Sequence, residues 1–412
     1  MPISKNKVQG IEWWENTPDF ELPLTVIYGG VKVNSEKILD KGFSHIALGS
    51  ALKPVRPSIK PKQRAILWTG IAYEDKEASW AKEKSPWDNN LPLLQRKWTK
   101  RINNFSEQYN ERLTDFRADI ITLDIEADLK QKKILSLKKS QNTPKNLQNL
   151  SDTDFIDAYH TDIVKLSCEP ITHLKNQLSH HTKISSYGDV PITRTWYDIK
   201  KYSWSEWITN PKMTDYLGSE GNEFSDNLNF LTPSAYFFFN TGENLAYCLF
   251  QIEANKAWSD KPLTLFVTPR YVGKKLYGKP ISPQLAEAMA IFPFFSGADG
   301  LWLWEASKKR NVLTDEMRPV YESFQKGLLR LSEHKSFFTG AYECVIPKPA
   351  REHFVDKDVL WRGIVKKNKI LIVAQNPFAL ENRITNISLE YNGFEAEIEL
   401  TGKEILLQVF DL

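Results

Sequence analysis

Residues 118–128 read ADIITLDIEAD, a short apolar run that ends in acidic residues instead of a turn. Because side chains alternate along a strand, Asp124, Glu126 and Asp128 share one face of it. Acids on the inner face of a buried strand carry a large desolvation cost unless they line the mouth of a barrel. The run therefore predicts a strand whose carboxyl end opens on a polar cavity.

Similar apolar runs precede and follow this one, and they alternate with helical patterns, which is typical of βα units around a parallel sheet. Strands are expected at residues 22–30, 43–49, 64–73, 118–128, 183–192, 230–239, 262–272 and 300–307. Helices are expected at 94–116, from Ser151 or Asp152 to His180, after Ser282-Pro283 and at 315–334, whereas the Lys- and Asn-rich residues 129–150 read mostly as a solvated loop. Eight such strands predict a (β/α)8 TIM barrel over residues 1–338.

The sequence after about residue 340 is rich in strand patterns. VLWRGIV and KILIVAQ flank a KKN turn, and Asn392-Gly393 between two further runs is a type I′ hairpin signal. We expect a small antiparallel β-sandwich over residues 339–412, which covers the barrel rather than acting as a separate binding module.

Composition limits the classes of function. The net charge of the 412 residues is only +3, which gives no support to a nucleic-acid partner. The 13 Trp, 15 Tyr and 22 Phe mostly build a core, but their flat rings also suit the C–H faces of sugars. Three cysteines, Cys168, Cys248 and Cys344, form no CxxC pair and are expected as buried free thiols.

No cofactor, metal or membrane segment is expected. The seven histidines form no HxH or HxxxH pair, and the sequence has neither GxGxxG nor GxxxxGKS/T. It also has no run of 18 apolar residues. The start, MPISKNKVQG, lacks an apolar signal core, so the protein is either cytoplasmic or, if an export signal has been removed, secreted or periplasmic. The oligomeric state stays open.

Active sites of such barrels lie at the carboxyl ends of the strands. Like charges in one row raise one pKa, and a glycosidase acid needs a carboxyl that keeps its proton near neutral pH. We assign Glu126 as the proton donor and Asp124 as the group that positions it or the substrate. The other candidates at strand ends are Asp128, Tyr187, Asp189, Tyr236, Arg270, Tyr271, Trp302, Trp304 and Glu305. Arg270 either binds an anionic group of the substrate or pairs with an acid such as Glu305.

Three motifs resemble those of the hyaluronidase family of glycoside hydrolases. They are Asp124-Ile125-Glu126, Pro233-Ser234-Ala235-Tyr236, and Gly297-Ala298-Asp299-Gly300 followed by a strand that ends at Trp304. The resemblance implies a barrel in which Glu126 is the acid, Asp124 positions an N-acetyl group, and Tyr236 and Trp304 shape the sugar site. The N-acetyl oxygen would then be the nucleophile.

The sequence departs from that family in two places near the site. Ala127-Asp128-Leu129 stands where the family has Trp-Arg-Pro, and Glu305 stands where it has Gly. Glu305 is therefore a candidate nucleophile or base. A gap of about 5 Å between two carboxyl groups would indicate retention, and one of about 6.5–9.5 Å inversion.

The sequence thus predicts a glycosidase acting on a polysaccharide, anionic or N-acetylated, with a carbohydrate as its partner. Two alternatives stay open. One is an exo-acting, galactosidase-type hydrolase of a sulfated or algal glycan that uses Glu126 and Glu305. The other is a barrel that binds glycan without catalysis.

Overall fold

The computed structural model describes residues 13–14, 16–33, 35–48, 56–69, 85–87, 90–125, 129–178, 180–193, 196–305 and 313–412. Its first part is an eight-stranded parallel sheet in the order β5-β4-β3-β2-β1-β8-β7-β6. The strands are β1 Thr25–Gly29, β2 His45–Leu48, β3 Arg64–Trp68, β4 Ile120–Leu123, β5 Lys183–Ser186, β6 Ser234–Ala235, β7 Thr264–Val267 and β8 Gly300–Trp304.

The edges of this sheet meet, so that the strands form a ring. A parallel bridge joins Tyr187, just after β5, to Thr232, just before β6. The N–H of Gly188 donates to the Thr232 carbonyl at 3.0 Å, and the N–H of Asn229 donates to the Ile184 carbonyl at 2.8 Å. The predicted (β/α)8 barrel is confirmed.

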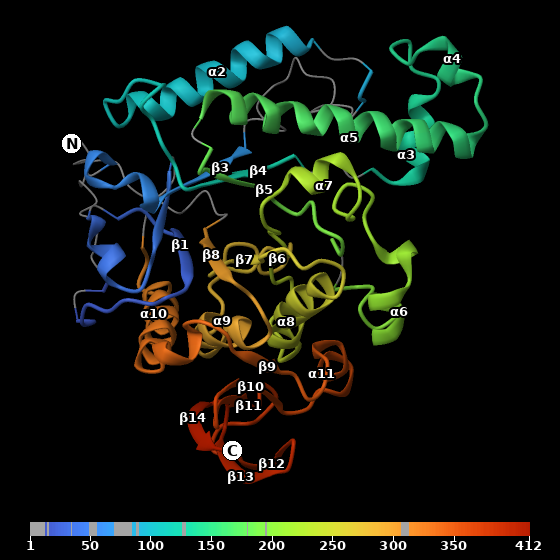
Figure 1. The fold of residues 1–412 in the computed structure, drawn as a ribbon. Coiled ribbons are helices and arrows are strands. Elements are labelled where there is room, and N and C mark those ends of the chain that lie inside the picture. The colour runs from blue at the N-terminus through green and yellow to red at the C-terminus, as the bar shows by residue number, and fades with distance from the viewer. Residues whose placement is uncertain are drawn as a thin grey trace, which may run out of the picture.

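The helices lie around the sheet, α2 and α5 beside β3–β5 and α8–α10 beside β6–β8 (Figure 1). Their bounds are α2 Leu91–Glu107, α5 Asp152–Gln177, α6 Trp204–Thr209, α7 Glu223–Asn227, α8 Glu243–Lys256, α9 Pro283–Phe295 and α10 Arg318–Glu333. Short 3-10 helices cover Glu36–Asp40, Arg56–Ser58, Pro61–Gln63, Pro211–Met213 and Lys335–Phe338. As the sequence predicted, Ser151 and Ser282 cap α5 and α9 by accepting hydrogen bonds from backbone N–H groups.

The insertion at 129–150 differs from the predicted solvated loop. It contains two helices, α3 Gln131–Leu137 and α4 Lys145–Gln148, at one end of α5 (Figure 1). Ile134 and Leu137, three positions apart, are buried on one face of α3, which packs against α5. The many lysines conceal this short apolar stripe in the sequence.

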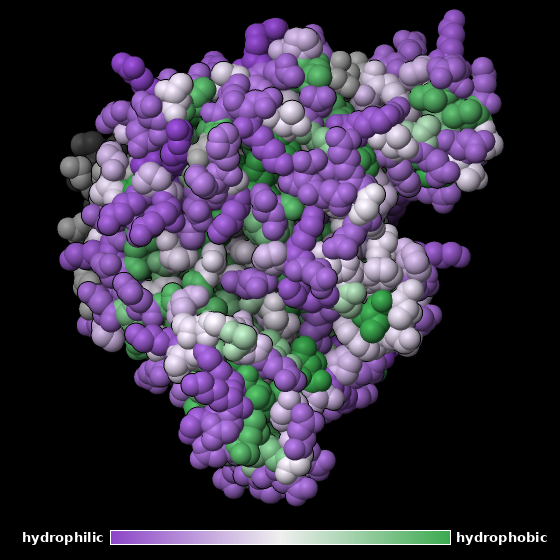
Figure 2. Space-filling view, viewed as in Figure 1, coloured by the Kyte–Doolittle hydropathy of each residue, from purple (hydrophilic) through white to green (hydrophobic). Residues whose placement is uncertain are grey.

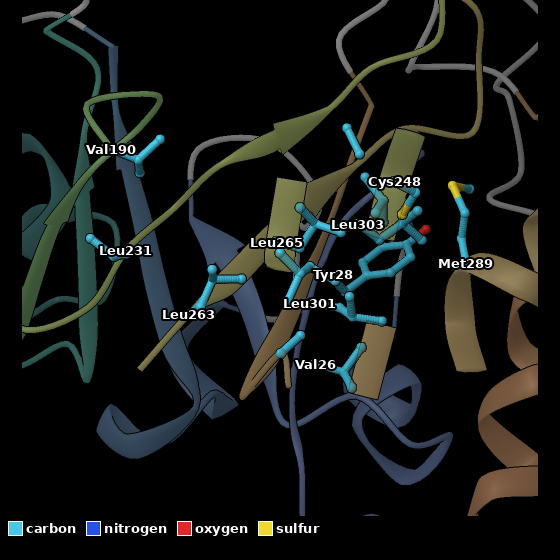
Figure 3. Close-up of a cluster of buried hydrophobic side chains, with 14 of the residues drawn as sticks. Val26, Tyr28, Val190, Leu231, Cys248, Leu263, Leu265, Met289, Leu301 and Leu303 are labelled. Atoms are coloured by element: carbon cyan, nitrogen blue, oxygen red, sulfur yellow. The ribbon is translucent and has the colours of Figure 1, made fainter. Parts of the chain in front are cut away.

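The two faces of the sheet are packed differently. Alternate side chains point outward to the helices, and Figure 3 shows Tyr28, Leu265, Leu301 and Leu303 gathered on the side of Met289 of α9. The inward side chains form a separate cluster made of Ile27, Ala47, Ala65, Ile120, Phe230, Phe266 and Trp302. The second cluster fills the barrel below the mouth.

The predicted C-terminal β-sandwich is also confirmed. Strands β9 Glu343–Val345, β10 Leu360–Lys366, β11 Lys369–Gln375 and β14 Ile405–Asp411 form one antiparallel sheet, and β12 Ile384–Tyr391 pairs with β13 Phe394–Thr401. A hydrophobic cluster lies between the two sheets, and the turn residues Asn392 and Gly393 both have positive φ, as a type I′ turn requires. Helix α11 (Ala350–Asp356) packs on α8, and β10 and β11 contact α9. The sandwich therefore covers the outside of the barrel (Figure 1), and the domain boundary at 338/339 stays a prediction.

Hydrophilic side chains cover most of the face shown in Figure 2, and a band of hydrophobic ones crosses the sandwich. Over the ranges given above, the structure contains no helix with both the length and the apolarity needed to cross a membrane.

Candidate active site

Asp124 is the carboxyl group that the barrel places at the carboxyl end of β4. Ile120 belongs to the inner cluster, whereas Ile121 and Leu123 belong to the outer one. Alternation therefore puts Thr122 and Asp124 on the inner face. Only 8% of Asp124 is exposed. Its Oδ1 has no hydrogen-bond partner among the described residues.

Burial has a direct electrostatic consequence for this group. Desolvation disfavours the carboxylate and raises the pKa of Asp124 from its ordinary 3.8 to about 7. A carboxyl that keeps a proton near neutral pH was predicted for this strand end on the basis of repulsion between acids. Among the described residues, the raised pKa of Asp124 has a different cause, which is the removal of water from its carboxyl group.

Glu126 and Asp128 lie outside the described residues. Their roles as proton donor and substrate-binding residue stay predictions.

Aromatic rings predicted for the site do come together. The Tyr187 ring lies 6.1 Å from that of Tyr236 and 4.9 Å from that of Phe266, which stacks on Trp302 at 4.7 Å. Tyr187, Tyr236 and Trp304 are partly buried and pack on the inner cluster. The rings of Tyr187, Tyr236 and Trp304 therefore close the packed interior at the carboxyl ends of β5, β6 and β8.

Gly29, at the end of β1, provides space for two of these indoles. A Cβ on this residue would lie 2.9 Å from Cε3 of Trp304 and 3.0 Å from Nε1 of Trp302. This position therefore requires glycine, because any side chain here would collide with the two indole rings.

Glu305 and Arg270 form a buried ion pair. Nε of Arg270 donates to Oε2 of Glu305 at 2.8 Å, and the Glu305 side chain is fully buried. Burial raises the pKa of Tyr28 and of Tyr321, two residues of the outer cluster, and the charge of Glu305 raises both pKa values further. Glu305 thus lies in the layer between the sheet and the helices, whereas Trp302 and Trp304 on the same strand point inward. Of the two roles left open for Arg270, the structure shows the second, which is the ion pair with Glu305.

Asp189 and Tyr271, which were also predicted for the site, each form a hydrogen bond with another side chain. Asp189 is buried and accepts a hydrogen bond from the Ser186 hydroxyl at 2.5 Å. Tyr271 is also buried, and its hydroxyl donates to Oδ1 of Asn240 at 2.9 Å, on the wall of a cavity beside the sandwich. Their roles in substrate binding stay predictions.

Sequence reasoning did not single out Thr122, Tyr197 or Phe239. Thr122 is buried below Asp124, and its hydroxyl has no partner in the described part of the chain. Tyr197 and Phe239 are 69% and 41% exposed, with ring centroids 6.1 Å apart, on the segments that follow β5 and β6. The aromatic stretch from 193 to 208 was the signal for Tyr197, but its pattern does not distinguish exposed rings from buried ones.

Within the described ranges, no three His, Cys, Asp or Glu residues are grouped so that they could hold a metal ion.

No family model and no curated protein matches the chain. Among solved structures, bee venom hyaluronidase is 11% identical, with a TM-score of 0.47 and coverage of 76% of this chain and 97% of that one. A conserved exported protein from Bacteroides fragilis is 11% identical, with a TM-score of 0.41 and coverage of 84% and 76%. Alpha-L-fucosidase isoenzyme 2 from Paenibacillus thiaminolyticus is 11% identical, with a TM-score of 0.42 and coverage of 80% and 51%. The first of these bears the name of the family that the sequence motifs resemble, but at this level of similarity the solved structures assign neither a family nor an activity to the chain.

Proposed function

We propose that this protein is a glycoside hydrolase that cleaves an N-acetylated polysaccharide at the mouth of its barrel. The observation that carries the proposal is the carboxyl of Asp124, which is buried on the inner face of the barrel and has a pKa of about 7. Glycosidic bonds break when a proton reaches the leaving oxygen, and the burial that keeps Asp124 protonated is the environment that a neighbouring acid needs to hold such a proton near neutral pH.

Each of the two acids has one role in the proposed reaction. Glu126, two positions beyond Asp124 in the sequence, donates a proton to the leaving oxygen. Asp124 keeps its own proton, and its other oxygen accepts a hydrogen bond from the N–H of the substrate's N-acetyl group and so orients that group. The N-acetyl oxygen attacks the anomeric carbon as the bond breaks. Water then opens the resulting ring, and its proton returns to Glu126.

The position of Glu305 favours this substrate-assisted route over one that uses two enzymic carboxylates. An acid that is fully buried and paired with Arg270 would have to leave that pair before it could reach a sugar. Removing one partner from a buried ion pair costs about 3–5 kcal/mol, because the other charge is left unpaired. A nucleophile supplied by the substrate avoids that cost.

The aromatic rings supply the complementary binding surface. The rings of Tyr187, Tyr236 and Trp304 have flat apolar faces, and each ring carries a hydroxyl or N–H group at its edge. A sugar ring likewise combines apolar C–H faces with hydroxyl groups at its edge.

The test is a screen for new reducing ends with hyaluronan, chondroitin, glycol chitin and sulfated algal polysaccharides, run beside Glu126→Gln. We expect an N-acetylated polymer to be cleaved by the wild type, and Glu126→Gln to lose about 10²–10⁴-fold in rate. The same polymer after chemical deacetylation is the matched control and should resist cleavage. Binding without hydrolysis would instead support a non-catalytic barrel, and equal cleavage of the deacetylated polymer would support the route through Glu305.

A further inference from the structure

A cavity of about 1220 Å³ lies between the barrel and the sandwich. The barrel contributes the segment after β6, the beginnings of α8 and α9, and one side of α10, and the sandwich contributes the β11–β12 and β13–β14 connections. We call this cavity the interdomain groove, and its walls include Asn240, Gln284, Ser323, Phe378, Leu380 and Lys403. Sites for small ligands occupy about 300–1,000 Å³, so the groove has room for several linked sugar rings.

The groove lies towards the same end of the barrel as Asp124. Helices α8 and α9 follow β6 and β7 in the chain, so each begins at the carboxyl end of the strand before it. Asn240 and Ser282, which precede these two helices, line the groove. A polymer that leaves the mouth on the β6–β7 side therefore passes this opening.

The described residues of the lining carry no net charge. Its three basic residues are Lys326, Arg330 and Lys403, and its three acidic residues are Glu287, Glu381 and Glu404. Glu287 is already paired, since its carboxylate accepts from Lys326 at 3.0 Å and from Arg330 at 2.6 Å. A polyanion would find no excess of positive charge here.

The remaining lining combines hydrogen-bonding groups with apolar surface. The side chains of Gln284 and Ser323 make no hydrogen bond to any other described residue. Asn244 is 1% exposed and donates to the Phe239 carbonyl, but its Oδ1 has no partner in the part of the chain that the structure describes. Phe378 and Leu380 add apolar surface, and Leu380 is 72% exposed. Hydroxyl groups and C–H faces of a neutral carbohydrate match both kinds of surface.

The groove is held in shape by contacts between the two domains. Arg330 on α10 donates to the Ile405 carbonyl of β14 at 2.8 Å. A Cβ on Gly242 would lie 2.5 Å from Cδ1 of Phe378, so only a glycine at the start of α8 lets the sandwich approach this closely. A preformed site loses little conformational freedom when it binds a ligand.

We propose that the interdomain groove is a second carbohydrate-binding site, which holds an uncharged stretch of the polysaccharide whose bond is cleaved at the barrel mouth. The inference rests on the proposed function for the identity of the ligand, and it gives the sandwich a role in binding.

The experiment measures polysaccharide binding by affinity electrophoresis in native gels that contain glycol chitin, xylan or agarose. All proteins carry Glu126→Gln, so that hydrolysis does not change the gel. Ser323→Trp fills the groove from α10, and Glu322→Trp adds the same side chain to an exposed neighbouring position that does not line the groove. The double variant Gln284→Ala/Ser323→Ala removes two hydrogen-bonding groups without adding bulk.

We expect glycol chitin, the N-acetylated polymer of the three, to retard the parent protein. Ser323→Trp and the double variant should weaken that binding about tenfold, the loss expected when two ordinary hydrogen bonds are removed, whereas Glu322→Trp should not. Equal binding by all four proteins, no retardation by any neutral polymer, or retardation by dextran sulfate alone would overturn the inference. Hydrolysis by the wild type without groove-dependent binding refutes only this inference, and groove-dependent binding without hydrolysis refutes only the proposed function.

Discussion

Asp124 connects local sequence to chemistry because burial raises its pKa. The folded-state pKa of about 7 lies above the ordinary value of 3.8, so between these pH values the folded protein holds a proton that the unfolded chain has released. The stabilisation linked to this proton is complete below pH 4 and is lost as the pH rises through 7. The difference between the two pKa values corresponds to about 4 kcal/mol at most.

Asp124→Asn removes this titration. The free energy of unfolding of the variant, measured relative to that of the wild type, should therefore increase as the pH rises from 4 to 8. Urea unfolding of both proteins across this range measures the effect, and titrating groups that do not interact with Asp124 cancel in the difference. Parallel pH profiles would show that Asp124 titrates as an ordinary exposed acid.

Gly29→Ala should displace an indole ring, because the added methyl group would lie about 3 Å from both Trp302 and Trp304. We expect a loss of about 1–3 kcal/mol in unfolding free energy and a shift in tryptophan fluorescence. The double variant Gly29→Ala/Trp304→Phe, with a smaller ring, should recover part of that loss. Wild-type stability and fluorescence in Gly29→Ala would contradict the packing described for the mouth.

The site residues were predictable to different degrees. Period-2 alternation was enough to place Asp124, Trp302 and Trp304 on inner faces, because inward and outward positions differ along a parallel strand. The same alternation puts Glu305, next to Trp304, on the outer face. It does not decide between the two roles weighed for Arg270, and the structure pairs these two residues, 35 positions apart. Such long-range pairs leave no periodic trace in a sequence.

At the scale of elements, the loops after β5 and β6 carry exposed aromatic rings at the end of the barrel where the site lies. Tyr197→Ala should raise the KM for a polymeric substrate about three- to tenfold, because one aromatic contact contributes about 0.5–1.5 kcal/mol. The kcat on a short substrate should not change. Steady-state kinetics on the polymer found in the screen gives both values.

Tyr277→Ala is the matched control for this change. Tyr277 is 61% exposed but, among the described residues, has no aromatic neighbour. Equal effects of the two substitutions would mean that the pair of rings formed by Tyr197 and Phe239 has no special part in binding the polymer.

Most elements were predicted from their periodicity and caps, and the errors have physical causes. Residues 230–239 suggested one long strand, yet β6 covers only Ser234–Ala235. Pro233, which offers no N–H to a neighbouring strand, separates it from the bridges of Leu231 and Thr232. The helices α3 and α4 were missed because a stripe of two apolar residues is too short to stand out among lysines.

For the whole molecule, a buried ion pair joins the barrel to the sandwich. Arg362 of β10 donates to Glu253 of α8 through Nη2 at 2.8 Å, and Glu253 also accepts from the Ser296 hydroxyl and the Ala350 N–H. Arg362 and Glu253 are 109 positions apart in the chain and almost fully buried. The sequence predicted both domains but contains no signal for this connection.

Glu253→Ala should cost about 3–5 kcal/mol, because it leaves the Arg362 charge buried and unpaired. Unfolding should then separate into two transitions, with the sandwich lost first. The double variant Glu253→Met/Arg362→Met removes both charges and should restore much of the stability. Calorimetry distinguishes these outcomes, and a single unshifted transition in Glu253→Ala would show that the pair does not hold the domains together.

The most direct test of a proton-bearing carboxyl in the barrel mouth is a titration of Asp124 by ¹³C NMR. Protein labelled at the side-chain carboxyl of aspartate is compared with labelled Asp124→Asn, and the resonance absent from the variant is followed with pH. We expect a midpoint of about 7 for that resonance. A midpoint near 4 would show that the carboxyl is solvated and ionised at neutral pH, which contradicts the basis of the proposed hydrolase.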